Sequence, residues 1–120
     1  MIFLAEDDDE LRTVLAEQLR ADGHQVVEAS DGRQLEAAME ASPDHREIVI
    51  CDLLMPGRTG LEVLADCRAH GWSPAFILMT GFADDDLRRQ ALRLGALAVI
   101  EKPLALDTLR TLLGRGARHA

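Results

Sequence analysis

Five short apolar runs, each followed by a longer segment with apolar residues at helical spacing, alternate along the whole chain. Runs of this length predict strands, and the longer segments predict amphipathic helices. Strands that alternate with helices pair in parallel through right-handed crossovers, which places helices on both faces of the sheet. The expected strands are 2–5, 25–29, 48–51, 75–79 and 97–100, and the expected helical segments are 11–19, 35–39, 61–67, 87–94 and 104–113.

Two of the expected strands, 48–51 and 75–79, are apolar throughout, as strands covered on both faces should be. A chain of 120 residues is close to the usual size of one domain, so we expect residues 1–120 to form a single domain without a second, output domain. Five strands in this length fit an α/β doubly wound sheet of order 2-1-3-4-5, the flavodoxin-like architecture, better than a barrel or a six-stranded dinucleotide fold.

Charge and composition narrow the classes of function. The formal net charge of -8 argues against a nucleic-acid binder of the basic-patch type, because the domain would be repelled by a phosphate backbone. No apolar run approaches the length of a membrane span and the N-terminus does not read as a signal peptide, so we expect a cytoplasmic protein without membrane contact. Cys51 and Cys67 lie in apolar segments without a CxxC spacing, which predicts buried thiols.

Polar side chains follow four of the five expected strands. In a doubly wound sheet, ligands bind outside the carboxyl ends of the strands, near the point where the strand order reverses. We therefore expect these residues to converge on one edge of the sheet. They are Glu6, Asp7, Asp8 and Asp9 after the first strand, Asp52 after the third, Thr80 after the fourth, next to Gly81, and Lys102 after the fifth, next to Pro103.

The acidic run 6–10 has two interpretations. Its last three members suit a helix N-terminus, where the helix dipole favours acids and Asp is a good cap. Glu6 and Asp7 would repel Asp52 across the sheet unless a cation shared the site. Carboxylates that leave room for a phosphoryl oxygen are typical of a magnesium site. On spacing alone, magnesium binding and simple helix capping both remain open.

Asp52, Thr80 and Lys102 each have a structural and a chemical interpretation. Asp52 can simply begin a turn, or its carboxylate can be a nucleophile that accepts a phosphoryl group. Thr80 can cap or turn the chain, or its hydroxyl can donate to a phosphoryl oxygen. Lys102 is the one lysine among 13 basic residues. It can be an ordinary surface residue, or it can supply the compact point charge that suits a phosphate.

The pattern of these residues resembles the receiver domains of bacterial two-component response regulators over the whole chain. The resemblance is carried by Glu6-Asp7, by Asp52 in the segment 52–60, by Thr80-Gly81 and by Lys102-Pro103. It implies that Asp52 is the phosphoryl acceptor and that Thr80 and Lys102 bind the phosphoryl oxygens. It also implies a cis peptide bond between Lys102 and Pro103.

The same resemblance implies a Mg²⁺ site. Asp7 and Asp52 would be direct ligands, Glu6 would act through water, and Leu54 would contribute its backbone carbonyl. Two residues depart from the family pattern. Glu6 stands where Asp is commonest, and Val99 stands where many receivers have Tyr or Phe, which puts the usual coupling between the threonine and an aromatic ring in doubt.

Two further positions bear on the lifetime of a phosphoryl group. In the resembled family, the residues two beyond the acceptor and two beyond the threonine often hold or shield the attacking water. Here they are Leu54 and Phe82, which cannot orient a water molecule, so we expect slow self-dephosphorylation. The alternative is that both side chains merely pack or lie exposed in mobile loops. Arg88, Arg89 and Arg93 lie on the polar face of the fourth expected helix, where we expect solvated side chains.

The resemblance implies a phosphorelay receiver rather than an enzyme. It would take a phosphoryl group from a histidine kinase or a histidine phosphotransfer protein. It would then change its surface around the fourth helix, the fifth strand and the fifth helix, to act on an output domain or a docking partner.

Two alternative functions belong to other classes of protein. A flavodoxin-like cofactor binder is disfavoured by the acidic loop after the first strand. An aspartate-nucleophile phosphatase is disfavoured because such enzymes have a second acid where this chain has Leu54.

Overall fold

The computed structural model describes residues 1–42, 47–82 and 84–119, and it contains one five-stranded parallel sheet in these ranges. The strand order is β2-β1-β3-β4-β5, as predicted. The strand order reverses at β1, between β2 on one side and β3 on the other. The strands are β1 (Ile2–Ala5), β2 (Val26–Ala29), β3 (Ile48–Asp52), β4 (Ala75–Thr80) and β5 (Ala98–Glu101).

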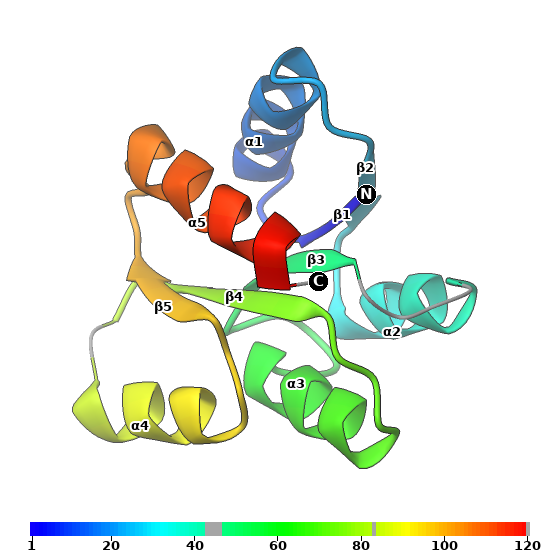
Figure 1. Ribbon diagram of the computed structural model, residues 1–120, viewed down its shortest axis with the longest axis vertical. Helices are drawn as coiled ribbons and strands as arrows, with labels where there is room; N and C mark the ends of the chain where they lie inside the picture. The colour runs from blue at the N-terminus through cyan, green and yellow to red at the C-terminus, as the bar shows by residue number, and fades with distance from the viewer. Residues whose placement is uncertain (43–46, 83, 120) are drawn as a thin grey trace.

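Five helices cover the two faces of the sheet (Figure 1). One apolar cluster joins α1 and α5 to one face, and it includes Leu15, Leu19, Ile50 and Leu109. A second cluster joins the other three helices to the opposite face. The helices are α1 (Asp9–Ala21), α2 (Gly32–Glu40), α3 (Gly60–Ala69), α4 (Asp85–Arg93) and α5 (Leu106–His119).

Side-chain caps set where the helices begin. The Asp8 carboxylate accepts a hydrogen bond from the Leu11 N–H, which confirms the capping role expected for this part of the acidic run. Thr59 and Glu62 form a reciprocal capping box at the start of α3. These helices therefore begin directly after their caps, one to two residues before the first apolar residue that the spacing had marked.

Two further sequence predictions, on a peptide bond and on the cysteines, are confirmed by the structure. The Lys102–Pro103 bond is cis. Cys51 and Cys67 are buried free thiols. No helix in the described ranges has the length and apolar character that crossing a membrane requires. The strands differ from their predicted bounds by one residue at most, and the extensions of β3 and β4 carry Asp52 and Thr80 inside the sheet.

Candidate functional site

The carboxyl edge of the sheet brings together the polar residues marked in the sequence. Asp52 ends β3 and Thr80 ends β4, and both are buried. Glu6 directly follows β1 and is fully buried, whereas its neighbour Asp7 is exposed. Lys102 directly follows β5. Parallel pairing in register places β1, β3 and β4 side by side, so their last residues share one edge.

Three carboxylates form a cluster at this edge. Glu6, Asp7 and Asp52 each offer one carboxylate oxygen, and these oxygens lie within 4.8 Å of one another. Carboxylate oxygens at such a spacing can bind one hard divalent cation, and the exposed side chain of Asp7 leaves the cluster open on one side. The donor set therefore fits the magnesium ion that the sequence pattern suggested.

The Lys102 ammonium bridges two of these acids. Its Nζ lies 2.5 Å from Glu6 Oε1 and 2.7 Å from Asp52 Oδ2. Burial alone would lower the pKa of Lys102, but its hydrogen bonds to Asp52 and Glu6 outweigh burial and raise that pKa above the ordinary value. Lys102 therefore carries its positive charge at neutral pH and offsets part of the negative charge of the cluster.

Glu6 is held by contacts on both its side chain and its backbone. Its Oε2 accepts a hydrogen bond of 3.2 Å from the Asp8 N–H, and its carbonyl accepts one of 2.8 Å from Arg12. Burial, followed by the contact with the Asp52 carboxyl, raises the pKa of Glu6 to about 7, against the lowering effect of Lys102. The cluster thus stores electrostatic strain that a cation would relieve.

Thr80 and Asp52 also take part in local turns. The Thr80 hydroxyl donates to the Phe82 carbonyl at 2.9 Å and accepts from the Phe82 N–H at 3.0 Å. The Leu54 N–H donates to Asp52 Oδ1 at 3.3 Å. The turn interpretation is therefore correct for both residues, and it coexists with their place at the site. For Thr80 to bind a phosphoryl oxygen, its hydroxyl must first leave the Phe82 carbonyl.

The residues that depart from the resembled pattern occupy different environments. Val99 is buried in the core of the face covered by α4, whereas Leu54 and Phe82 are 68% and 70% exposed. Arg89 and Arg93 are exposed as expected. The expectation was wrong for Arg88, because its guanidinium donates to the Val99 carbonyl at 2.8 Å. No sequence signal marks this bond, since its acceptor is a backbone atom of another element.

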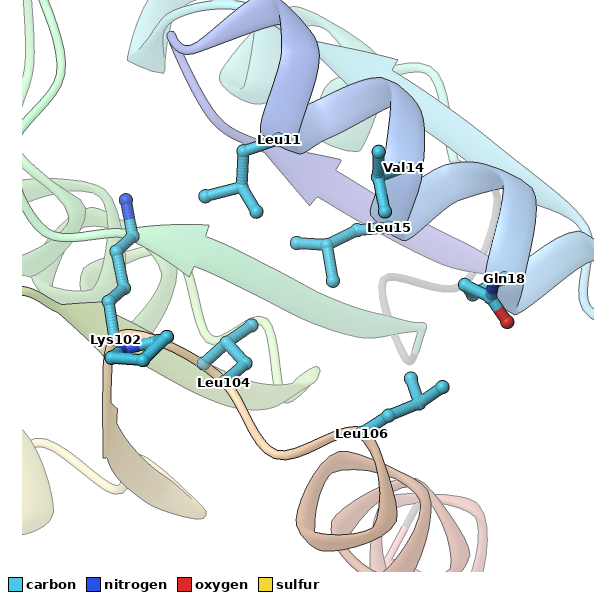
Figure 2. A pocket seen from close by; sticks show the side chains of 8 residues that line it. Leu11, Val14, Leu15, Gln18, Lys102, Leu104 and Leu106 are labelled. Carbon is cyan, nitrogen blue, oxygen red and sulfur yellow. The ribbon is translucent and has the colours of Figure 1, made fainter.

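An apolar groove of about 600 Å³ adjoins the site (Figure 2). Leu11, Val14 and Leu15 line it from α1, Leu104 lines it from the segment before α5, and Leu106 lines it from the start of α5. Lys102 also borders the groove, so the groove is continuous with the carboxylate cluster. The spacing of the apolar residues of α1 predicted an apolar face. The sequence did not predict that part of this face is exposed to solvent.

Known proteins resemble this chain in sequence and in fold. The family model described as the response regulator receiver domain matches residues 2–114. The transcriptional regulatory protein FixJ of Azorhizobium caulinodans is 36% identical over 98% of this chain, which spans 57% of that protein. The sporulation initiation phosphotransferase F of Bacillus subtilis is 29% identical over 91% of this chain and 86% of its own length. The structure of the chemotaxis protein CheY4 of Vibrio cholerae superimposes with a TM-score of 0.85 at 23% identity, covering 96% of each chain.

Proposed function

This chain belongs to the response regulator receiver domain family, and we propose that it accepts a phosphoryl group from a phosphohistidine donor onto Asp52. The observation that carries the proposal is the position of the Asp52 carboxylate. It ends β3 beside two further carboxylates and within 2.7 Å of the chain's one lysine ammonium. No other group in the described ranges combines a buried acid, a pair of further acids and a half-buried ammonium in this way.

The proposed transfer is a single displacement at phosphorus. A carboxylate oxygen of Asp52 forms the new P–O bond, and the P–N bond of the donor imidazole breaks, so that the electron pair stays with the leaving ring. Lys102 exchanges its contact with the Asp52 carboxylate for a phosphoryl oxygen. Thr80 gives up the Phe82 carbonyl and donates its hydroxyl to another phosphoryl oxygen.

We propose Glu6, Asp7 and Asp52, with the Leu54 carbonyl, as the residues that hold Mg²⁺, with Asp7 as a direct ligand and Glu6 acting through water. Bound magnesium would neutralise the charge that accumulates when a phosphoryl group meets three acids. Without that charge, the incoming group faces two buried carboxylates and one exposed carboxylate against a single ammonium.

The partner we propose is a histidine kinase or a histidine phosphotransfer protein in the cytoplasm. The apolar groove beside Lys102 supports a protein donor, because a protein can bury the half-open face of α1 while it presents its phosphohistidine to Asp52. We further propose that residues 1–120 act as one signalling domain. Its phosphorylation changes the α4–β5–α5 surface for an output domain or a docking partner, without nucleic-acid or membrane contact and without turnover of an external substrate.

Asp52→Ala should reduce phosphoryl incorporation from acetyl phosphate and magnesium to background, because the proposed attacking oxygen belongs to the Asp52 carboxylate. Intact mass measures the incorporation, and a thermal melt followed by circular dichroism checks the fold. The fold should survive, since removing one acid from the cluster relieves repulsion while Glu6 still accepts from Lys102. Asp107→Ala, which removes an aspartate that is 98% exposed, is the matched control and should incorporate as the wild type does. Incorporation that persists in a folded Asp52→Ala protein would refute the assignment.

A further inference from the structure

The two ends of α4 are attached to the rest of the molecule by different contacts. At the C-terminal end, Arg68 of α3 donates to the Leu94 carbonyl at 2.8 Å and to the Gly95 carbonyl at 3.0 Å. The same guanidinium donates to the Trp72 carbonyl at 3.0 Å, so it joins the ends of α3 and α4. This end of α4 is therefore held by the planar guanidinium of Arg68, which makes several hydrogen bonds at once.

The N-terminal half of α4 has much weaker attachment. Among the nine residues of this helix, Ala91 is the one that is buried, and Leu87 is half-buried. The polar contact to the sheet comes from Arg88, which donates to the Val99 carbonyl at 2.8 Å and lies 4.0 Å from the Glu101 carboxylate. That ion pair is largely exposed and contributes little, so the bond to the Val99 carbonyl is the main polar attachment.

Val99 and Glu101, the two residues that Arg88 contacts, both belong to β5, the strand that leads to Lys102. Glu101 pairs in register with Thr80, and the Lys102 N–H donates to the Thr80 carbonyl at 2.8 Å. Thr80 is in turn bonded to Phe82, two residues before Asp84, the N-cap of α4. A rearrangement of Thr80 and Lys102 therefore reaches α4 from both sides, through Phe82 and through β5.

We propose that Arg88 is the tether that holds the N-terminal half of α4 on β5, and that phosphorylation of Asp52 releases it. The helix then pivots about its C-terminal end, which Arg68 keeps in place. The release rests on the proposed phosphorylation, whereas the tether itself does not. The Arg88 guanidinium bonds to the backbone carbonyl of Val99. The side chain of Val99 is buried and has no polar atom, so it cannot itself link β5 to α4.

Hydrogen–deuterium exchange of residues 85–93 tests the tether in the unphosphorylated protein. Arg88→Gln should speed exchange of this segment roughly fivefold, as expected for the loss of one hydrogen bond of ordinary strength. Arg89→Gln is the matched control, because Arg89 pairs within the helix with Asp86 and should leave exchange at the wild-type rate. Equal exchange in Arg88→Gln and the wild type would overturn the tether. A Glu101→Gln protein that matches Arg88→Gln would overturn its assignment to the Val99 carbonyl.

The same measurement after treatment with acetyl phosphate and magnesium tests the release. Wild-type exchange in 85–93 should rise to about the level of Arg88→Gln, and the Arg88→Gln protein should change less than twofold on phosphorylation. An equal rise in both proteins would overturn the release. Intact mass of each sample reports the phosphoryl group. If the wild type takes up none, the proposed function and the release fail together, and the comparison without donor still decides the tether.

Discussion

Single side chains set the balance of charge at the end of β3. Lys102 bonds two buried carboxylates at once, and the phosphoryl group of the proposed reaction would bring further negative charge to the same ammonium. Glu6 has a side chain one methylene longer than that of aspartate, and its carboxylate reaches Lys102 while its backbone directly follows β1. We infer that Lys102 holds the acids together before transfer and binds phosphate after it.

Leu54 and Phe82 should lengthen the life of the phosphoryl group, because neither side chain can hold a water molecule in line behind phosphorus. Both are exposed beside the site, on the turns that follow β3 and β4. We expect a Leu54→Asn and Phe82→Glu double variant to lose the phosphoryl group roughly tenfold faster, equivalent to about 1.4 kcal/mol in the barrier.

The measurement for these two positions is the decay of phosphorylated protein after the donor is removed, followed by intact mass. Leu92→Gln is the control, because Leu92 is an exposed leucine of α4 and not part of the turns at the site. Its decay should equal that of the wild type. Equal decay in the double variant and the wild type would show that the lifetime is set elsewhere.

At the scale of secondary-structure elements, the close approach of α3 to β3 positions the acceptor. A Cβ atom added to Gly60, the first residue of α3, would lie 2.6 Å from the Asp52 carbonyl oxygen and 2.7 Å from Leu78 Cδ2. The absence of a side chain therefore lets the helix begin directly against the end of the strand, where the capping box of Thr59 and Glu62 fixes it.

Gly60→Ala should destabilise the protein by about 1–3 kcal/mol, because the new methyl group must displace backbone atoms of β3. Urea unfolding followed by circular dichroism gives the free energy of unfolding. Gly114→Ala, in α5 with no atom within 4 Å of an added Cβ, should instead stabilise by about 0.5–1 kcal/mol. If both variants unfold at the same urea concentration as the wild type, α3 does not press on β3 as described.

The elements themselves were predictable from the sequence, and the reason is periodicity. Apolar runs marked every strand to within one residue, and the strand-end rule marked Glu6, Asp52 and Lys102 as neighbours. What could not be predicted are contacts whose partners are backbone atoms, such as Arg88 with the Val99 carbonyl and Thr80 with Phe82. The pattern of residue types along a chain does not show which backbone carbonyl a side chain will contact.

At the scale of the whole molecule, the net charge is -8, and part of the negative charge is concentrated at one place. Three acids converge at one edge of the sheet, and burial denies two of them the water that would screen their repulsion. This repulsion lowers the stability of the folded protein, and it acts separately from the apolar packing on the two faces of the sheet. A cation that binds only the folded protein offsets that cost.

Magnesium should therefore raise the melting temperature of the unphosphorylated protein. At about ten times its dissociation constant, a ligand specific to the folded state stabilises by about 1.4 kcal/mol, which for a domain of this size corresponds to a shift of roughly 5 °C. Asp7→Ala should abolish the shift, whereas Glu10→Ala, which removes another exposed acid of the same run, should retain it. The measurement is thermal melting at matched ionic strength with sodium or magnesium chloride, since a general screening effect would act equally on both variants. A shift that survives in Asp7→Ala, or that is absent from the wild type at millimolar magnesium, would contradict the metal site and leave the acidic run as a helix cap alone.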